Sequence, residues 1–254
     1  MLYDRIISKN LVHVQKDKLP VILDVGCGNG DFVARMSRLG FLCYGIDIEF
    51  KQGQYLDELL SNGKIKLIDT GIENRRSLTS GARYIWPKFE SDIDVVCSRA
   101  VLEHVFNLDE FIINSKMVIG KRNGIHIHYF PSKYSIIEPH TGIPFGAIFQ
   151  NKLYFMVCCY VGFCFKKFRF RGQSAYDYVK QYTCYRSRLE IDENFIKHGY
   201  RVLKSRSPLN CHKRTLLKLS SKIKIIDKFF RLFRSDVSVY SLDSNTQIEN
   251  LQNN

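Results

Sequence analysis

The sequence predicts an α/β fold built on a seven-stranded, mostly parallel sheet with helices on both faces and an insertion after the fifth strand. Short apolar runs alternate with helical stretches through the first 130 residues. A glycine-rich turn follows the first of these runs, at 26–30. Proline, aromatic and basic residues gather after residue 130 and interrupt the alternation.

Five strands are expected first, and the apolar runs place them at 21–25, 42–47, 64–69, 93–98 and 124–130. Helices are expected between them, at 30–39, 50–61 and 107–119. Strands that alternate with helices form a parallel sheet covered on both faces, so this part is Rossmann-like. Residues 1–19 are expected to form a helix over the side of the sheet that carries the ligand.

The remaining chain completes a single domain of 254 residues. A helix is expected at 174–197, a sixth strand at 199–203, a basic helix at 213–234 and a seventh strand at 237–242. The domain then divides into a core at 20–130, an insertion at 131–172, a C-terminal part at 173–243 and a polar tail at 244–254, which we expect to be disordered.

The glycine-rich turn predicts a pocket for a nucleotide-type cofactor. Gly26, Gly28 and Gly30 lack a Cβ, so the backbone can take positive φ and a ligand can approach it closely. The helix that follows offers unpaired N–H groups. Asp47 ends the second strand, where a carboxylate can accept hydrogen bonds from two ribose hydroxyls. This spacing allows either a nicotinamide cofactor or S-adenosylmethionine.

Three details favour S-adenosylmethionine. Asp24 would repel a pyrophosphate but suits a cofactor with a cationic amine and a sulfonium. The glycine pattern is Gly-x-Gly-x-Gly, whereas dinucleotide-binding proteins favour Gly-x-Gly-x-x-Gly. An acid-His turn, Glu103-His104, follows the fourth strand. Together, these features resemble the class I S-adenosylmethionine-dependent methyltransferases over about residues 20 to 130. The resemblance also implies an antiparallel last strand.

The resemblance and the fold imply a set of cofactor contacts. Main-chain groups of Gly26, Cys27 and Gly28 would face the methionine end of the cofactor, with Asp24 near the amine. Asp47 would bind the ribose. Adenine would lie against Ile48, with its amino group near Asp69. The full set expected to hold the cofactor is Asp24, Gly26, Cys27, Gly28, Gly30, Asp47, Ile48, Asp69, Ser98 and Arg99.

The acid-His turn is similar to that of ubiquinone-pathway O-methyltransferases, in which Glu-x-x-Glu-His can hold a divalent metal. Here Ala100 stands at the first glutamate position, which leaves Glu103 and His104. Two ligands on one segment make a poor site for a hard cation, so we expect no metal. His104 can orient or deprotonate an acceptor hydroxyl. A purely structural histidine is the alternative.

The segment from Phe130 to Phe145 resembles a block of methyltransferases of surface-polysaccharide and lipopolysaccharide biosynthesis. Pro139 and Pro144 stiffen this loop after the fifth strand, where an acceptor would enter. We expect Glu138 and His140 to lie over the cleft and to help remove the proton of a sugar hydroxyl. The alternative is that both residues only hold the loop together.

Charge and composition bear on partners and location. Basic residues exceed acidic ones by 13, which favours phosphate-bearing partners such as nucleic acid or lipid headgroups. Eight cysteines without a Cys-x-x-Cys pair, and no apparent signal peptide, favour a reduced, cytoplasmic protein. The apolar run 153–165 is too short to span a bilayer. Basic-aromatic residues follow it at 166–171, and an apolar stripe with basic neighbours recurs at 218–234, so we expect contact with an anionic membrane surface.

The favoured hypothesis is therefore an S-adenosylmethionine-dependent O-methyltransferase that acts on a sugar or glycolipid at the inner face of the membrane. An RNA methyltransferase is the first alternative, because of the positive charge. No separate RNA-binding module or base-methylation motif is evident, which makes nucleic acid the less favoured partner. A cofactor-binding but inactive subunit is the second alternative. The oligomeric state stays open.

Overall fold

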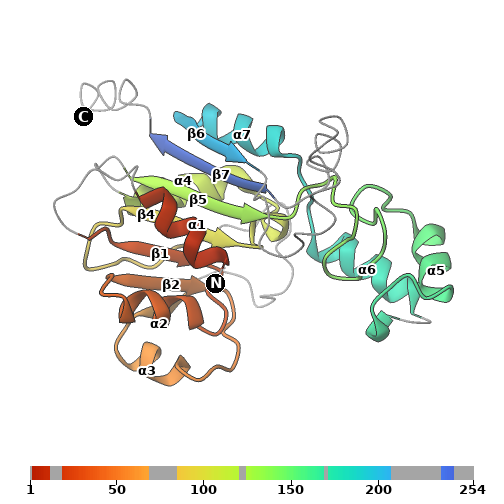
Figure 1. Cartoon of the computed structure of the whole chain (residues 1–254), viewed down its shortest axis with the longest axis horizontal. Coiled ribbons are helices and arrows are strands. Elements are labelled where there is room, and N and C mark those ends of the chain that lie inside the picture. Colours follow the sequence, from red (N-terminus) through yellow and green to blue (C-terminus); the bar gives the residue numbers. More distant parts are fainter. Residues whose placement is uncertain are drawn as a thin grey trace, which may run out of the picture.

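A computed structural model describes residues 2–11, 19–68, 85–119, 124–168, 171–206 and 236–242. Within these ranges, seven strands form one sheet in the order β3-β2-β1-β4-β5-β7-β6 (Figure 1). The strands are β1 Ile22–Val25, β2 Cys43–Asp47, β3 Ile65–Leu67, β4 Val95–Arg99, β5 Ile125–Phe130, β6 Tyr200–Arg206 and β7 Asp236–Leu242.

Strands β1 to β5 pair in parallel, and β7 lies antiparallel between β5 and β6. The predicted fold class, with its antiparallel last strand, is confirmed. Chain order reverses between β1 and β4, since β1 pairs with β2 on one side and with β4 on the other. In open α/β sheets, ligands bind at such a reversal, beyond the carboxyl ends of the strands.

Helices cover both faces of the sheet. On one face, α1 Leu2–Asn10, α2 Asp31–Arg38 and α3 Leu56–Ser61 share a buried cluster with Ile22 of β1. On the other face, α4 Leu108–Ile119 and α7 Arg188–Lys197 pack on Leu23 of the same strand. Neighbouring strand residues point to opposite faces, so the near-continuous apolar run of β1 serves both clusters.

Two helix predictions are wrong in their extent. The helix expected at 50–61 begins only at Leu56, because the preceding residues form a loop that folds over the glycine turn, where Lys51 N–H donates to the Gly28 carbonyl (3.2 Å). The helix expected at 174–197 is two helices, α6 Gly172–Tyr182 and α7. The chain is extended at Thr183, and Ser187 starts α7 with a capping box to Glu190.

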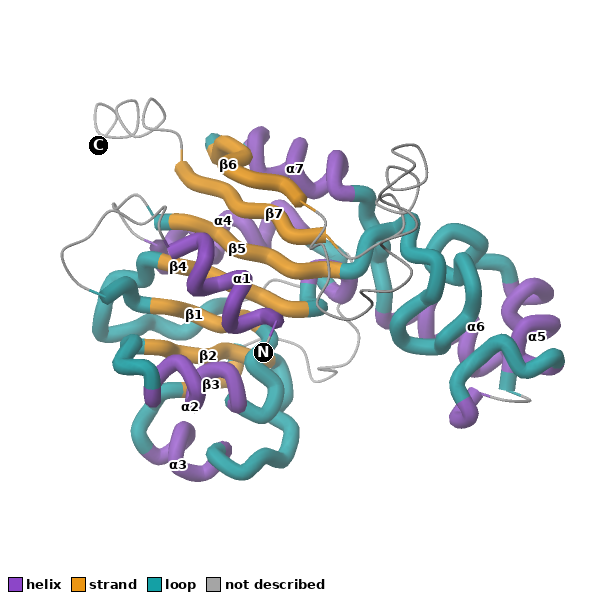
Figure 2. The backbone as a smooth tube through the Cα atoms, in the orientation of Figure 1, coloured by secondary structure: helices purple, strands orange, loops and turns teal. Residues whose placement is uncertain are grey.

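The insertion forms a lobe beside the sheet (Figures 1 and 2). Its helices, α5 Lys152–Tyr160 and α6, pack around a separate core that includes Phe155, Cys159 and Val179. A Cβ on Gly172 would lie 2.3 Å from the Met156 Cα, so the two helices touch closely there. The boundary expected at residue 172 therefore falls inside the lobe, and α6 belongs with the insertion.

Several other expectations can be compared with the structure. Seven of the eight cysteines are described, and all seven are free thiols. None of the helices in the described ranges has the length and apolar character needed to cross a bilayer. The basic helix expected at 213–234 and the tail at 244–254 lie outside the described residues.

Candidate active site

The glycine turn joins β1 to α2 in the backbone conformation that the sequence predicts. Gly26, Gly28 and Gly30 have φ values of 74°, 59° and 76°. A Cβ on Gly26 would lie 2.3 Å from a Val101 methyl group, so packing excludes one there. A Cβ on Gly28 would meet nothing within 4 Å. Gly28 therefore needs its glycine for the left-handed backbone and for the open space above it.

Asp47 is held by the turn and the loop that flank it. Its Oδ2 accepts a hydrogen bond from the Gly28 N–H (2.7 Å), and its Oδ1 accepts one from the Ile48 N–H (2.7 Å). Oδ1 also accepts a longer hydrogen bond from the Glu49 N–H (3.3 Å). Each carboxylate oxygen has two acceptor sites, so Oδ2 can still accept a hydrogen bond from a ligand. The carboxylate is thus oriented in advance at the end of β2, where the sequence predicts contact with a ribose.

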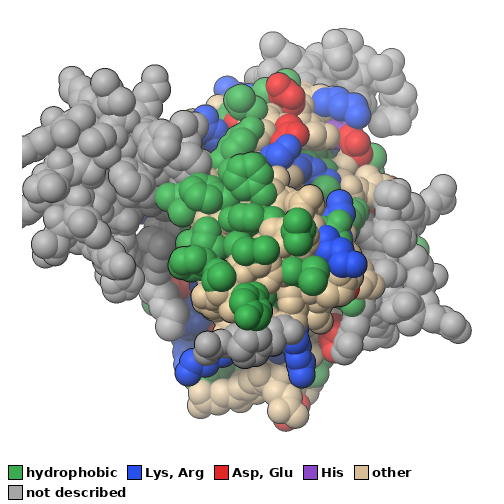
Figure 3. Space-filling view, turned by 90° about the vertical axis from the view of Figure 1, so that its right-hand side faces the viewer, with side chains coloured by type: hydrophobic (Ala, Val, Ile, Leu, Met, Phe, Trp, Pro, Cys, Tyr) green, Lys and Arg blue, Asp and Glu red, His purple; other side chains and the backbone are tan. Residues whose placement is uncertain are grey.

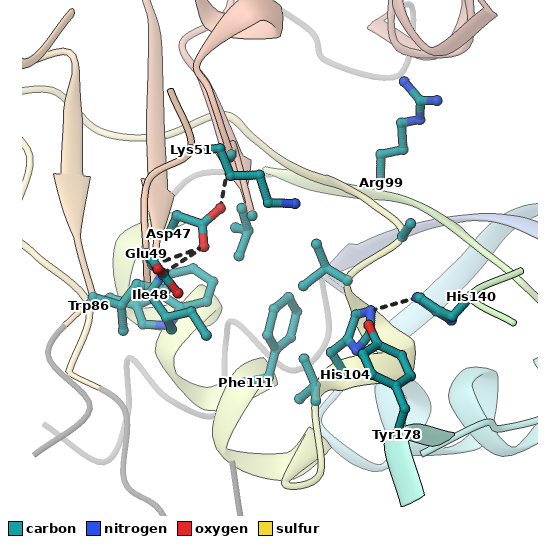
Figure 4. Close-up of a pocket in the computed structure, with 17 residues that line it drawn as sticks. Asp47, Ile48, Glu49, Lys51, Trp86, Arg99, His104, Phe111, His140 and Tyr178 are labelled. Carbon is teal, nitrogen blue, oxygen red and sulfur yellow. Dashed lines mark hydrogen bonds between the residues drawn. The ribbon is translucent and has the colours of Figure 1, made fainter. Parts of the chain in front are cut away.

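A cavity of about 510 Å³ opens beside Asp47 at the carboxyl edge of the sheet. This volume lies within the usual range for a small-molecule site. Figure 4 shows Asp47 on one side of the cavity and His104 with His140 on the other. Its lining includes five residues expected to hold the cofactor: Gly26, Gly28, Asp47, Ile48 and Arg99. Trp86, Phe111 and Tyr178 add aromatic walls that the sequence analysis missed.

A second cavity, of about 310 Å³, lies next to the first and shares Gly26 and Arg99 with it. Asp24 and Cys27 line this cavity. The sequence predicts both residues at the methionine end of the cofactor, with the Asp24 carboxylate near the amine. Burial raises the pKa of the Cys27 thiol, and the carboxylates of Asp24 and Asp47 raise it further. Cys27 is therefore a neutral wall of this cavity.

Two of the residues expected to hold the cofactor, Ser98 and Gly30, line neither of the two cavities, and a third cannot be placed. Ser98 points into the protein, where its hydroxyl is hydrogen-bonded to His128 Nδ1 (2.7 Å). Gly30 faces the Leu59 side chain, and a Cβ there would lie 2.5 Å from it, so this glycine serves packing. Asp69 lies outside the described residues.

The acid-His turn forms a short 3₁₀ helix, Leu102–His104, directly after β4. Ala100 takes a left-handed backbone with φ 56°, which bends the chain sharply toward the cavity. Arg186, from the segment between α6 and α7, donates hydrogen bonds to the carbonyl groups of Val105 (2.8 Å) and Phe106 (2.9 Å). The lobe thus fixes the position of this turn, a long-range tie that sequence spacing does not indicate.

Glu138 is fully buried and does not lie over the cleft, so that part of the prediction is wrong. Its carboxylate accepts hydrogen bonds from His140 Nδ1 (2.8 Å), from the Thr141 N–H and from the Tyr185 hydroxyl. Burial by itself would raise the pKa of Glu138, but the hydrogen bonds from these three residues lower it to about 2. Glu138 is therefore an ionised positioning residue that acts through His140.

His140 and His104 meet at the mouth of the larger cavity. Their Nε2 atoms lie 3.2 Å apart (Figure 4). His104 Nδ1 bonds the Tyr182 carbonyl (2.6 Å), and burial lowers the pKa of this histidine. The sequence nominated both histidines but gave no sign that they touch, because they come from the turn after β4 and the loop after β5.

Glu103 is almost completely buried next to the two histidines, and its Oε1 lies 4.0 Å from His104 Nε2. Neither of its side-chain oxygens has a hydrogen-bond partner in the described part of the chain. Burial raises the pKa of Glu103 to about 8, and the nearby charge of Glu138 adds to the rise. The turn therefore carries a buried carboxyl group that the protein itself does not satisfy.

Comparison with known proteins shows the family of this chain. The family model of the methyltransferase domain matches residues 3–131, just over half of the chain. The chain belongs to this methyltransferase family. Solved structures that share its fold include S-adenosylmethionine-dependent methyltransferases, and S-adenosylmethionine is the cofactor that the sequence predicts. The intact glycine turn, the oriented Asp47 carboxylate and the paired cavities fit that cofactor.

Two curated relatives are both named as ubiquinone biosynthesis O-methyltransferases. The mitochondrial ubiquinone biosynthesis O-methyltransferase of Dictyostelium discoideum is 31% identical over 137 residues, which cover 50% of this chain and 40% of that protein. The ubiquinone biosynthesis O-methyltransferase of Pelagibacter ubique is 32% identical over 104 residues, or 41% of this chain and 39% of that protein. The methyltransferase thus matches about two fifths of the length of each relative.

Solved structures support the fold over nearly the whole chain. An S-adenosylmethionine-dependent methyltransferase from Mesorhizobium loti covers 95% of this chain and is itself covered completely, with a TM-score of 0.53 and 10% identity. The plantazolicin methyltransferase BpumL, solved with a pentazolic desmethylPZN analogue and SAH, matches 95% of this chain and 84% of its own, with a TM-score of 0.54 and 15% identity. At such identities the likeness concerns the fold alone.

Proposed function

We propose that this methyltransferase methylates a hydroxyl group of a sugar or glycolipid used in surface-polysaccharide assembly. The observation that carries the proposal is the histidine pair, His104 and His140, at the mouth of the cofactor cavity. A sugar hydroxyl is a weak nucleophile at neutral pH, so a nearby proton acceptor speeds its methylation, typically by about 10²–10⁴-fold.

The chain supplies such an acceptor. Glu138 accepts a hydrogen bond from His140 Nδ1, which leaves the lone pair of His140 Nε2 free to take the proton of the acceptor hydroxyl. His104 Nε2, 3.2 Å away, can then share that proton. The acceptor oxygen forms its new bond to the methyl carbon while the bond from that carbon to sulfur breaks. The cofactor supplies the methyl group when bound; the protein positions the two reactants and holds the proton.

The lobe supports an acceptor at a membrane. Its apolar face comprises side chains of α5 and the turn after it, with 45% to 76% of each exposed: Leu153, Met156, Val157, Tyr160, Val161 and Phe163. Figure 3 shows hydrophobic side chains gathered over this side of the molecule, with lysine and arginine around them. Exposed patches of this kind mark interaction surfaces.

The positive charge of the lobe favours an anionic partner. Among its described residues, the exposed charged side chains are Lys152, Lys166, Lys167, Arg171, Lys180 and Asp177, so basic groups outnumber acidic ones by five to one. An apolar face with a basic border suits an anionic lipid surface, such as the cytoplasmic leaflet of a membrane. A lipid-linked glycan in that surface would reach the cavity from the lobe side.

An acceptor screen tests the proposal. The purified protein is incubated with S-adenosylmethionine labelled in its methyl group and, separately, with a glycolipid extract, a prenylated phenol and transfer RNA. Label in the saccharide part of the glycolipid supports the proposal. Label only in the phenol, which the names of the two ubiquinone relatives favour as the second candidate, would overturn it. Label only in RNA would favour a nucleic-acid acceptor instead.

A further inference from the structure

We propose that Glu103, His104 and His140 form a binding site for a divalent transition-metal ion beside the acceptor oxygen. The sequence analysis expected no metal, because the turn after β4 offers only two ligands. The structure brings a third ligand from the lobe: one potential ligand atom of each residue lies within 4.8 Å of the others. The ion's part in transfer rests on the proposed function, whereas the binding site itself rests on the geometry.

The hydrogen bonds of the two rings determine where their protons lie. A carbonyl oxygen can only accept, so His104 Nδ1, bonded to the Tyr182 carbonyl, must carry its hydrogen. His140 Nδ1 carries its hydrogen too, since its partner at 2.8 Å is Glu138 Oε1, an oxygen of the carboxylate that also accepts from the Thr141 N–H. In the neutral rings both Nε2 atoms therefore present lone pairs, and these lone pairs face each other.

Two facing lone pairs 3.2 Å apart repel each other unless a positive charge lies between them. A shared proton is one such charge, and a metal ion is another. With zinc–nitrogen bonds of about 2.0–2.1 Å and tetrahedral angles, two histidine ligands lie about 3.3 Å apart. The observed separation of the Nε2 atoms already matches that of two ligands on one ion.

Glu103 supplies the second, independent observation. Its carboxyl group is buried, 3% of the residue is exposed, and its oxygens lack hydrogen-bond partners among the described residues. A buried polar group left unsatisfied costs about 1–3 kcal/mol, so proteins retain few of them. Coordination of a cation next to His104 would give this carboxylate the partner that it lacks among the described residues.

The surroundings of the three ligands match those of known metal sites. Ligating histidines in metalloproteins donate their other ring N–H to a carboxylate or a backbone carbonyl, which fixes the tautomer. His140 does the first through Glu138, and His104 does the second through Tyr182. Two imidazoles and one carboxylate suit a Zn²⁺-like ion better than Mg²⁺, which prefers oxygen ligands.

This set differs from Glu-x-x-Glu-His, because Ala100 leaves the first position of that pattern without a ligand and His140 comes from another element. Both histidines line the cavity, so a fourth position on the ion would face the acceptor. When bound there, such an ion would lower the pKa of a hydroxyl on that position. In the metal-free protein, the proton taken from the acceptor hydroxyl would lie between the two Nε2 atoms instead.

Cobalt binding to the metal-stripped, full-length protein tests the site directly, since Co²⁺ replaces Zn²⁺ and absorbs visible light. We expect saturable binding of one ion per chain. Glu103→Gln and His140→Ala should each weaken it about 100-fold or more, and Glu138→Gln about 10- to 100-fold. His198→Asn is the matched control, because His198 also pairs with a carboxylate, Asp109 (2.6 Å), but no second histidine among the described residues is hydrogen-bonded to it.

S-adenosylmethionine binding by each variant shows that it is folded, and this readout is independent of any acceptor. The proposal is overturned if the wild-type protein shows no saturable cobalt binding, or if Glu103→Gln and His140→Ala bind cobalt as tightly as the His198→Asn control. Cobalt binding at these residues without methyl transfer to any saccharide would contradict the proposed function while supporting the metal site.

Discussion

His104 Nε2 lies 3.2 Å from His140 Nε2, although 36 positions separate the two residues in the chain. The contact joins the turn after β4, which belongs to the cofactor half, to the loop that opens the lobe. Arg186 and Glu138 hold the two sides of this contact from within the lobe. Cofactor and acceptor chemistry thus meet at a junction between two parts of the fold, and the following predictions examine each side of it.

Asp47→Ala should weaken binding of S-adenosylmethionine about 100-fold or more, because it removes the carboxylate that would accept a charge-assisted hydrogen bond from the ribose and leaves the Gly28 N–H without its acceptor. Isothermal titration measures the effect. Asp57→Ala, an exposed carboxylate on α3, is the control and should bind normally. Equal affinities in the two variants would show that Asp47 does not hold the cofactor.

His140→Ala should leave cofactor affinity nearly unchanged and reduce the rate of methyl transfer about 10²–10⁴-fold, since His140 lies on the far side of the cavity from Asp47 (Figure 4). Titration calorimetry and single-turnover transfer separate the two effects. If His140→Ala lost cofactor binding as Asp47→Ala does, the division of roles between the two ends of the cavity would be wrong.

Glu103→Gln should stabilise the metal-free protein at pH 8 and change its stability little at pH 5. Glu103 has a pKa of about 8 in the folded protein and a usual value of 4.5. A raised carboxyl pKa means that the unfolded state binds fewer protons between these values, so stability falls as the pH rises through that window. The full difference is on the order of 4 kcal/mol.

Thermal unfolding after chelation, at both pH values, measures this difference. Glu193→Gln, an exposed glutamate on α7, serves as the control and should show no such pH dependence. A Glu103→Gln variant that is equally stabilised at pH 5 and pH 8 would mean that the buried carboxyl group titrates normally.

Val157→Asp on the apolar face of the lobe should reduce binding to anionic phospholipid vesicles about 10-fold or more, because it places a negative charge where apolar area enters the interface. Co-sedimentation with vesicles measures the loss. Met117→Asp provides the same change at an exposed position of α4, outside the lobe, and should bind as the wild type does. Identical losses in the two variants would point to a general charge effect.

The cofactor half could be predicted from local sequence because its signals are local. The glycines at 26, 28 and 30 and the acid at 47 follow apolar strands, and the parallel order of those strands brings them to one edge. The lobe could not be predicted in this way. Its contacts to the turn, through Arg186 and Tyr182, join segments about eighty positions apart.

Some signals were present in the sequence but were not used. Ser187 and Glu190 form a capping box, which would have divided the long helix expected at 174–197. The alternation of side chains in β4 places Ser98 on the face opposite to Cys97, the face on which its hydroxyl is hydrogen-bonded to His128, and both faces of this strand are buried. By contrast, nothing local indicated that Glu138 would be buried behind His140.

The most direct test of the account is the position of the transferred methyl group. We would incubate the protein with methyl-labelled S-adenosylmethionine and a glycolipid extract, and then locate the label by linkage analysis of the saccharide. The account predicts a methyl ether on a sugar oxygen that His140→Ala no longer produces. A labelled nitrogen or carbon atom, or the same ether formed at the same rate by His140→Ala, would contradict it.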